Sequence, residues 1–430
     1  MPKSWACMKY IKRHIENLVL ETHRTFKCLL LTGARQTGKS TVLQKLFPKL
    51  PYVTLDDTFI REQAQENPAT FILLNPPPVT YDEVQHAPQL FSQIKIKVDH
   101  EQKYGAFCLS GSQPLNLMKN VSESLAGRVG ILELPTLSLR EIQKDSFNMP
   151  FVPSLDYISK RQNTAKMPKN IWTIIHRGGY PEMQNPAMNW ATFFSSYVTT
   201  YLERDVRQLT AVQNLNDFRK FMVAVAARTG QMLNYANIAD EIGKDEKTIK
   251  NWISILNASH IIYILEPYAN NALKRAIKTP KVYFRDTGLA AYLTRWLTPE
   301  TLANGAMAGA FFETFVVNEI VKSYANRGID YRFSMFYYRG RDKVTGKIHT
   351  DHGDIIKSSE KEIDFIIEEN GILYPIEIKM NSNVKAEQSS AFQVLDAIPE
   401  KKRGTGAIIC MCPQPAFLRE NLIAIPVWYI

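Results

Sequence analysis

The chain has 430 residues, a formal net charge of +10 and 45% hydrophobic residues. This length exceeds what one ordinary hydrophobic core organises, so we expect two to four domains. The sequence has no run of about 18 apolar residues, and its basic N-terminal segment lacks the apolar core of a secretory signal. We therefore predict a cytoplasmic protein without a membrane segment.

The cysteines and the excess of basic residues bear on zinc binding and on nucleic-acid binding. The five cysteines are scattered and form no CxxC pair of the kind that binds zinc, so reduced, buried thiols are expected. The positive net charge is compatible with DNA or another nucleic acid as a partner, because lysine and arginine neutralise phosphates. Charge alone does not separate such a protein from basic proteins with other ligands.

Residues 28–134 alternate short apolar runs with stretches long enough for crossover helices. The runs are CLLLTG, YVTLDD, VTYDEV, AFCLSGS and VGILEL. This alternation is typical of an α/β domain in which helices wrap a mostly parallel sheet. We place the domain at residues 1–142.

A phosphate-binding signature follows the first apolar run directly. The stretch GARQTGKS fits the pattern G-x-x-x-x-G-K-[ST] and lies between an apolar strand and the helical stretch STVLQKLF. In such a P-loop, backbone N–H groups bind the β- and γ-phosphates of ATP, the lysine neutralises them and the serine binds Mg²⁺. The predicted nucleotide-binding residues are Gly33, Ala34, Arg35, Gln36, Thr37, Gly38, Lys39, Ser40 and Thr41.

An acidic pair ends the third apolar run. We expect Asp82 to hold Mg²⁺ together with Ser40, and Glu83 to activate the attacking water as general base. Both side chains can reach the phosphate crevice, because they lie at the carboxyl end of a strand. Ser112, at the end of the next strand, could sense the γ-phosphate or could simply form a turn. A pair of solvated carboxylates is the alternative for the two acids.

The middle of the chain divides into two further units. Residues 143–169 are polar and punctuated by prolines, which favours an extended connection at the start of a helical region spanning 143–230. Residues 231–300 contain two helical patterns separated by Gly243 and followed by a β-branched run, which predicts a winged helix. The second helix could meet DNA phosphates, although Asp245 and Glu246 oppose this. Its candidate phosphate contacts are Lys244, Lys247, Lys250 and Asn251.

A series of motifs resembles a family of bacterial and archaeal ATPases of the AAA superfamily. KYIKRHIE, LLTGARQTGKST, VTYDEVQHAP, LSGSQP, GGYPE, YLERDV, DTGLAAYL and EIDFII…YPIEIKM occur in that order. The resemblance implies ATP binding, ATP hydrolysis and a C-terminal domain of unknown function that is similar to restriction endonucleases. Thr80 and Tyr81 depart from the aliphatic residues usual in the third strand, but they leave the acidic pair intact.

The resemblance also implies a role for Arg128. In AAA ATPases an arginine just before the fifth strand often reaches the nucleotide of a neighbouring subunit, and Arg128 of LAGRVGILEL occupies that place. Such an arginine would stabilise the transferring phosphoryl group and would require a homo-oligomer. The alternative is a structural ion pair.

The stretch EIDFIIEENGILYPIEIKM predicts a hairpin with three charged residues on one face. Asn370-Gly371 is a strong signal for a two-residue turn, which sets Asp364 opposite Glu377. Lys379 shares their face, whereas Ile363, Phe365, Ile367, Ile372, Tyr374, Ile376 and Ile378 are expected to fill the other.

Two opposed carboxylates repel each other unless a cation lies between them, and Mg²⁺ is a suitable cation. The D…ExK pattern is similar to the restriction-endonuclease active site, in which the two acids hold the metal and the lysine activates water. Glu313, on a helix from about residue 305, would complete the metal shell. The alternative is that Lys379 alone bridges Asp364 and Glu377 on an inactive domain.

These patterns predict a P-loop AAA-type domain, a helical and winged-helix middle region, and a restriction-endonuclease-like α/β domain at residues 301–430. The expected function is Mg²⁺-dependent ATP binding and hydrolysis, with action on nucleic acid through the C-terminal domain. The alternative is a nucleotide-dependent switch that regulates a protein partner through an inactive C-terminal domain.

Overall fold

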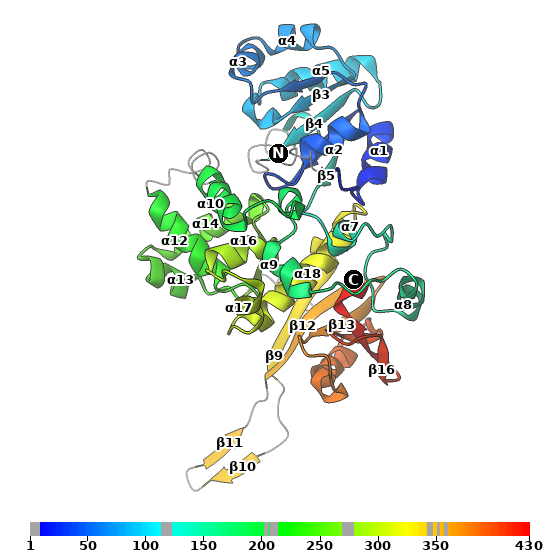
Figure 1. Ribbon diagram of the computed structural model, residues 1–430, viewed down its shortest axis with the longest axis vertical. Coiled ribbons are helices and arrows are strands. Elements are labelled where there is room, and N and C mark those ends of the chain that lie inside the picture. The colour runs from blue at the N-terminus through cyan, green and yellow to red at the C-terminus, as the bar shows by residue number, and fades with distance from the viewer. Residues whose placement is uncertain are drawn as a thin grey trace, which may run out of the picture.

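The computed structural model describes residues 9–112, 123–201, 206, 214–268, 279–341, 347–350, 353–356 and 360–430. Figure 1 shows an N-terminal unit at one end, a helical region beside the centre, and a C-terminal sheet packed along helix α18 (Ala308–Ala325). Within these described ranges, no helix has the length and apolar character needed to cross a membrane.

A parallel sheet forms the centre of the N-terminal unit, as predicted. Among the described residues its five strands follow the order β2-β3-β4-β1-β5, and every pairing is parallel. The strands are β1 (Cys28–Thr32), β2 (Tyr52–Thr54), β3 (Val79–Asp82), β4 (Phe107–Gly111) and β5 (Val129–Glu133). The helices are α1 (Glu16–Thr25), α2 (Lys39–Leu46), α3 (Thr58–Glu66), α4 (Pro68–Leu74) and α5 (Leu90–Glu101).

Both faces of this sheet are covered, which explains its uninterrupted apolar strands. Cys28 and Leu30 of β1 pack into a cluster with residues of α3, α4 and α5. Leu29 and Leu31 point to the opposite face and pack with α1 and α2. Because successive side chains of a strand alternate between faces, β1 contributes to both layers.

The connection after the first sheet is not wholly extended, contrary to our prediction. After α7 (Leu139–Ile142), residues Leu155–Gln162 form helix α8, which Ser154 caps by accepting from the Tyr157 N–H at 3.2 Å. The guanidinium of Arg161 is buried and donates to the carbonyls of Trp428 and Tyr429, both at 3.1 Å. Contacts with the end of the chain therefore stabilise a helix that local sequence did not indicate.

The middle region is helical, with a small antiparallel sheet of order β6-β8-β7. The predicted order of two helices and a strand is observed: α13 ends before Gly243, whose φ is +70°, and α14 is followed by β7. The assignment to the winged-helix fold stays a prediction. The helices are α9 (Ile171–Arg177), α10 (Trp190–Tyr201), α12 (Leu215–Ala226), α13 (Tyr235–Ile242), α14 (Glu246–Ala258), α16 (Thr287–Leu293) and α17 (Pro299–Ala303). The strands are β6 (Gln231–Met232), β7 (Ile262–Leu265) and β8 (Lys281–Phe284).

Helix α18 packs between the middle region and the C-terminal sheet (Figure 1). One continuous hydrophobic cluster runs from Leu139 to Ile430, so the core does not break at residue 300. Within the described residues the sheet follows the order β16-β17-β15-β13-β12-β9, with β14 paired to β13. The strands are β9 (Met335–Arg341), β12 (Glu360–Glu369), β13 (Ile372–Ile378), β14 (Lys402–Arg403), β15 (Gly406–Cys410), β16 (Ala416–Arg419) and β17 (Leu422–Pro426). The short strands β10 (Lys347–Thr350) and β11 (Gly353–Ile356) form a separate pair.

The hairpin of β12 and β13 has the predicted register. Phe365 pairs with Ile376, and Asn370 and Gly371 have φ values of +52° and +77°, as a turn with two left-handed residues requires. One detail was wrong: Ile363 packs with Ile366 on the other face from Phe365. A register shift against β9 between Ile363 and Ile366 causes this, because a bulge reverses the alternation of side chains.

The charged face of the hairpin is also more covered than predicted. The 3₁₀ helix η5 (Ala386–Ala397) lies over it, and Phe392 and Leu395 join the same hydrophobic cluster as Leu373 of β13. Glu377 is consequently buried, with 7% of its surface exposed.

Candidate functional site

The predicted phosphate-binding loop connects β1 to α2. Gly33 has a φ of +143°, and a Cβ atom there would lie 2.4 Å from the carbonyl oxygen of Leu134. Gly38, with a φ of +91°, precedes the first residue of α2. Only glycine adopts these conformations without strain, which explains the two fixed glycines of the pattern. The Lys39 ammonium is buried and donates to the carbonyls of Gly33 at 3.2 Å and Ala34 at 2.9 Å.

Asp82 lies beside this loop and contacts its serine. The Ser40 hydroxyl donates to Asp82 Oδ1 at 2.9 Å and to Oδ2 at 3.0 Å. The hydroxyls of Tyr52, at 2.5 Å, and Ser110 donate to the same carboxylate. The two residues that sequence reasoning paired are thus together, whereas Tyr52 was missed because a strand tyrosine gives no signal of such a contact.

Glu83 is turned toward the loop by its backbone. Its φ of +54° is left-handed, which ends β3 and directs the carboxylate to Ser112, whose hydroxyl donates at 2.9 Å, and to Gln85. Burial by itself would raise the pKa of Glu83, but the charge of Lys39, hydrogen bonds from Gln85 and Ser112 and the charge of Arg35 hold it below its usual range. The carboxylate is therefore ionised at neutral pH, as a general base must be.

A cavity of about 780 Å³ opens in front of the loop. This volume is within the usual range for small-molecule sites, about 300–1,000 Å³. Besides the loop and Glu83, its lining includes residues before α1 and residues of the GGYPE motif, to which the sequence assigned no contact. These are Tyr10, Ile11, Arg13, Pro181 and Glu182.

Arg13 contacts the backbone of the phosphate loop through its guanidinium group. It is buried, and its guanidinium donates to the carbonyls of Thr37 at 2.9 Å and Pro135 at 2.6 Å and to Glu141 Oε1 at 3.1 Å. It therefore positions the backbone of the loop.

Arg128 lies away from its own chain's phosphate loop. It directly precedes β5, whereas the loop follows the carboxyl end of the neighbouring β1. Its guanidinium forms a two-point ion pair with Asp99, with distances of 2.6 Å to Oδ1 and 2.8 Å to Oδ2. This is the structural ion pair that we considered as the alternative. A contact with a second subunit stays a prediction.

A network that the sequence did not indicate joins the first sheet to the middle region. Arg285, directly after β8, donates to Glu133 at the end of β5, to the Tyr331 hydroxyl and to His260 Nδ1, the last at 2.9 Å. Burial would raise the pKa of Glu133, but Arg285 and His260 lower it to about 2. Burial lowers the pKa of His260 to about 4, against the charge of Glu133 and with a smaller contribution from Arg285.

The hairpin acids lie together, with Lys379 between them. The Lys379 ammonium is 2.6 Å from Glu377 Oε1 and 3.5 Å from Asp364 Oδ2, and the latter oxygen also accepts from the Ile378 N–H at 2.9 Å. Burial and the nearby Asp364 raise the pKa of Glu377 to about 8, although Lys379 opposes the shift. This arrangement corresponds to the alternative in which the lysine bridges the acids.

The predicted three-carboxylate metal shell is not assembled. Glu313 of α18 instead accepts from the Tyr283 hydroxyl at 2.7 Å and pairs with the buried Lys281 at 3.3 Å. Burial and the nearby charge of Asp364 raise the pKa of Glu313 to about 6, against the charge of Lys281. Over the ranges that the structure describes, no three His, Cys, Asp or Glu side chains are placed to hold a metal ion. The contact of Glu313 with Lys281, which the middle sheet contributes, was not anticipated from the sequence.

Two of the three lysines predicted to contact DNA, at and just before α14, form ion pairs within the protein. Lys244 pairs with Asp217 at 2.8 Å, and Lys250 pairs with Glu246 at 3.3 Å. Lys247 is exposed. Asp245 caps α14 by accepting from the Thr248 N–H at 2.9 Å, which gives this acid a structural role.

The four cysteines within the described ranges, Cys28, Cys108, Cys410 and Cys412, are buried and free, as predicted. Cys7 and most of the YLERDV motif lie outside those ranges.

Comparison with known protein families gives three matches along the chain. Residues 25–143 match the family model described as an AAA domain. Residues 168–300 and 356–430 match two domains of unknown function, DUF8612 and DUF4143. An uncharacterised protein of Mycobacterium tuberculosis and one of Mycobacterium bovis are each 26% identical over 402 residues, which cover 91% of this chain and 79% of the relative.

Solved structures with partial similarity include ATPases of two archaea. A Walker-type ATPase of Pyrococcus abyssi has 12% identity and a TM-score of 0.39, covering 66% of this chain and 96% of its own. A signal transduction ATPase with numerous domains from Pyrococcus horikoshii has 10% identity and a TM-score of 0.25, covering 76% of this chain and 50% of its own. The family match over residues 25–143 and the loop geometry together support ATP binding.

Proposed function

We propose that this protein hydrolyses ATP with Mg²⁺ at the loop of residues 33–41. The observation that carries the proposal is the contact of Ser40 with Asp82 beside the ionised Glu83. A serine hydroxyl and a carboxylate are hard oxygen ligands of the kind that Mg²⁺ prefers, so the residues fit the ion. When bound, Mg²⁺ would neutralise charge on the phosphates.

The chain's own groups have distinct tasks in this reaction. Lys39 would exchange the loop carbonyls for phosphate oxygens, since its ammonium now donates to Gly33 and Ala34. Glu83 would take the proton of the attacking water at Oε2. Ser112, which donates to that oxygen at 2.9 Å, would orient the carboxylate and could respond to the γ-phosphate.

Glu83→Gln tests this assignment. We expect ATP hydrolysis to fall by at least about 100-fold while ATP binding persists, because the amide keeps the shape but cannot accept the proton. Glu62→Gln, at an exposed position of α3, is the matched control and should keep the wild-type rate. Hydrolysis at the wild-type rate by Glu83→Gln would rule out this base, and a wild-type chain that binds ATP without hydrolysing it would rule out the proposed activity.

We further propose that the C-terminal domain acts on nucleic acid. The close approach of Asp364, Glu377 and Lys379 on one hairpin supports this. Metal binding there would require Lys379 to leave the space between the two carboxylates. A nucleotide-dependent switch with an inactive C-terminal domain is the second candidate, and the lysine bridge itself favours it.

Two measurements separate these candidates. Action on nucleic acid predicts that double- or single-stranded DNA increases the rate of ATP hydrolysis, whereas the switch predicts no change. Nuclease activity further predicts cleavage of linear, circular or single-stranded DNA with Mg²⁺ or Mn²⁺, and its loss in Asp364→Ala and Lys379→Ala. Equal cleavage by all three chains, or none with any substrate, would leave only the structural role of the cluster.

A further inference from the structure

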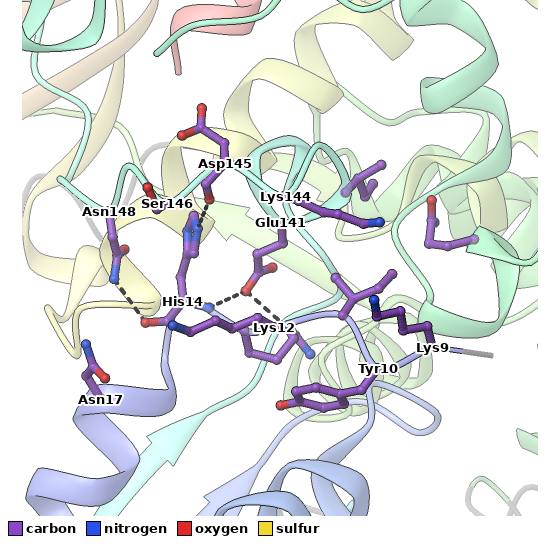
Figure 2. Close-up of a pocket in the computed structure, with 14 residues that line it drawn as sticks. Lys9, Tyr10, Lys12, His14, Asn17, Glu141, Lys144, Asp145, Ser146 and Asn148 are labelled. Carbon is purple, nitrogen blue, oxygen red and sulfur yellow. Dashed lines mark hydrogen bonds and ion pairs between the residues drawn. The ribbon is translucent and has the colours of Figure 1, made fainter. Parts of the chain in front are cut away.

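A second cavity of about 610 Å³, drawn in Figure 2, shares lining residues with the nucleotide cavity. Both cavities are lined by Tyr10, Ile11 and Arg13, so the segment before α1 forms a wall of each. On another side the second cavity is lined by the end of α7 and the residues after it, namely Glu141, Ile142, Lys144, Asp145, Ser146 and Asn148. Neither the P-loop nor the acidic pair contributes to it.

The two carboxylates of this cavity are already satisfied by the protein. Glu141 Oε1 accepts from Arg13 at 3.1 Å and Oε2 accepts from the Ser138 N–H at 2.8 Å. Figure 2 shows the contact of Glu141 Oε1 with the His14 N–H, at 2.7 Å. Asp145 accepts from the buried guanidinium of Arg161 and from the Phe147 N–H. Each acid is thus neutralised by an arginine.

Three lysines at the same cavity have no such compensation. Lys9 and Lys12 come from the segment before α1 and Lys144 from the segment after α7, and all three are exposed (Figure 2). Among the residues that the structure describes, none of the three has a carboxylate within 4.0 Å. The cavity therefore carries a net positive charge, which favours an anionic ligand.

Amide side chains complete the lining of the cavity. Asn148 donates through Nδ2 to the His14 carbonyl at 3.0 Å, and its Oδ1 is enclosed by protein. Asn17 and Gln184 add further amide groups to the lining.

We propose that this cavity binds a small molecule that carries two or more phosphate groups. The phosphates would meet the lysines, because three ammonium groups match a polyanion better than a single carboxylate. A volume of about 610 Å³ is suitable for a ligand of that size.

Occupancy of the cavity acts on the phosphate loop through Arg13. The same guanidinium contacts Glu141 in the wall of the cavity and the carbonyl of Thr37 in the loop. A ligand that shifts the segment before α1 therefore changes the affinity for ATP, and by linkage ATP changes the affinity for that ligand. This coupling rests on the proposed ATPase function, whereas binding to the cavity does not.

Direct binding is measured by calorimetry on the full-length Lys39→Ala chain, in which the P-loop no longer neutralises phosphates. The probes are inorganic tripolyphosphate and a hexose bisphosphate. We expect one site for each probe, and an affinity about tenfold weaker when Lys9, Lys12 and Lys144 are all changed to glutamine. A matched control changes three exposed lysines elsewhere, Lys49→Gln, Lys103→Gln and Lys169→Gln, and should alter the affinity less than about twofold.

Absence of binding of both probes to Lys39→Ala, or equal losses in the two triple-glutamine chains, would overturn the site.

The coupling needs a separate measurement on the wild-type chain. The hexose bisphosphate should change the KM for ATP by at least about twofold, and this change should disappear in the chain with Lys9→Gln, Lys12→Gln and Lys144→Gln. A constant KM with intact binding would overturn the coupling alone. A chain that binds the probe but does not hydrolyse ATP would overturn the proposed function and not the site.

Discussion

The guanidinium of Arg285 forms an ion pair with the carboxylate of Glu133, across the contact between the first sheet and the middle region. Glu133 is the last residue of β5 and pairs in the sheet with Thr32, after which the phosphate loop begins. Arg285 directly follows β8 and also contacts His260 and Tyr331. The pair therefore links the strand edge beside the loop to the rest of the chain.

Breaking this pair on one side should destabilise the fold strongly. Arg285→Met or Glu133→Gln leaves one largely buried charge without its partner, and we expect a loss of about 3 kcal/mol in the free energy of unfolding. Urea denaturation measures this loss. The exposed pair of Arg332 with Asp330 provides the control, since Arg332→Met should cost less than about 1 kcal/mol. Equal losses for the two arginines would contradict a structural role of the Arg285 contact.

The hairpin acids predict an unusual dependence of stability on pH. The pKa of Glu377 is raised from 4.5 to about 8, so between these values the folded chain holds a proton that the unfolded chain has lost. The free energy of unfolding should therefore fall as the pH rises from about 5 to 8, by roughly 3 kcal/mol. Thermal melts with EDTA, which removes divalent metal ions, measure the trend. Glu377→Gln stays neutral throughout and should flatten it, and an identical slope in both chains would contradict the assignment.

Arg128 can be assigned by mixing inactive chains. If its guanidinium acts on the nucleotide of a neighbouring subunit, a mixture of Lys39→Ala and Arg128→Ala chains should regain part of the ATP hydrolysis that each lacks, because some interfaces then combine two intact halves. If the ion pair with Asp99 is its only role, mixing restores nothing and Asp99→Ala reproduces the effect of Arg128→Ala. The rate of ATP hydrolysis against mixing ratio separates the two outcomes.

The lysines of α14 give a test of DNA contact. Lys244 is paired with the largely buried Asp217, whereas Lys247 is exposed and Lys250 has only an exposed ion pair with Glu246. Lys247 and Lys250 are therefore the positions from which phosphates could be met. Changing both to glutamate should lower the affinity for DNA. It should also reduce the slope of a plot of log affinity against log salt concentration, by about one for each lost phosphate contact. Lys220→Glu, on α12, together with Lys160→Glu, on α8, is the control of equal charge. An unchanged salt dependence would exclude α14 from the DNA interface.

The sequence by itself determined the parts of this protein that depend on neighbouring residues. The phosphate loop needs glycine at two positions with positive φ, and the Asn370-Gly371 turn sets the hairpin register for the same local reason. The parallel sheet followed from apolar strands that are buried on both faces. The contact between Ser40 and Asp82 was predictable because the carboxyl ends of parallel strands meet at one edge.

Only the tertiary structure decided which distant charges meet. Helix α8 forms in a polar stretch because Arg161 reaches carbonyls near residue 430, and Glu313 pairs with Lys281 of another sheet. The pair of Arg285 with Glu133 joins residues separated by 152 positions. Side-chain spacing carries no information about such partners, because burying a charge requires compensation but leaves open which residue provides it.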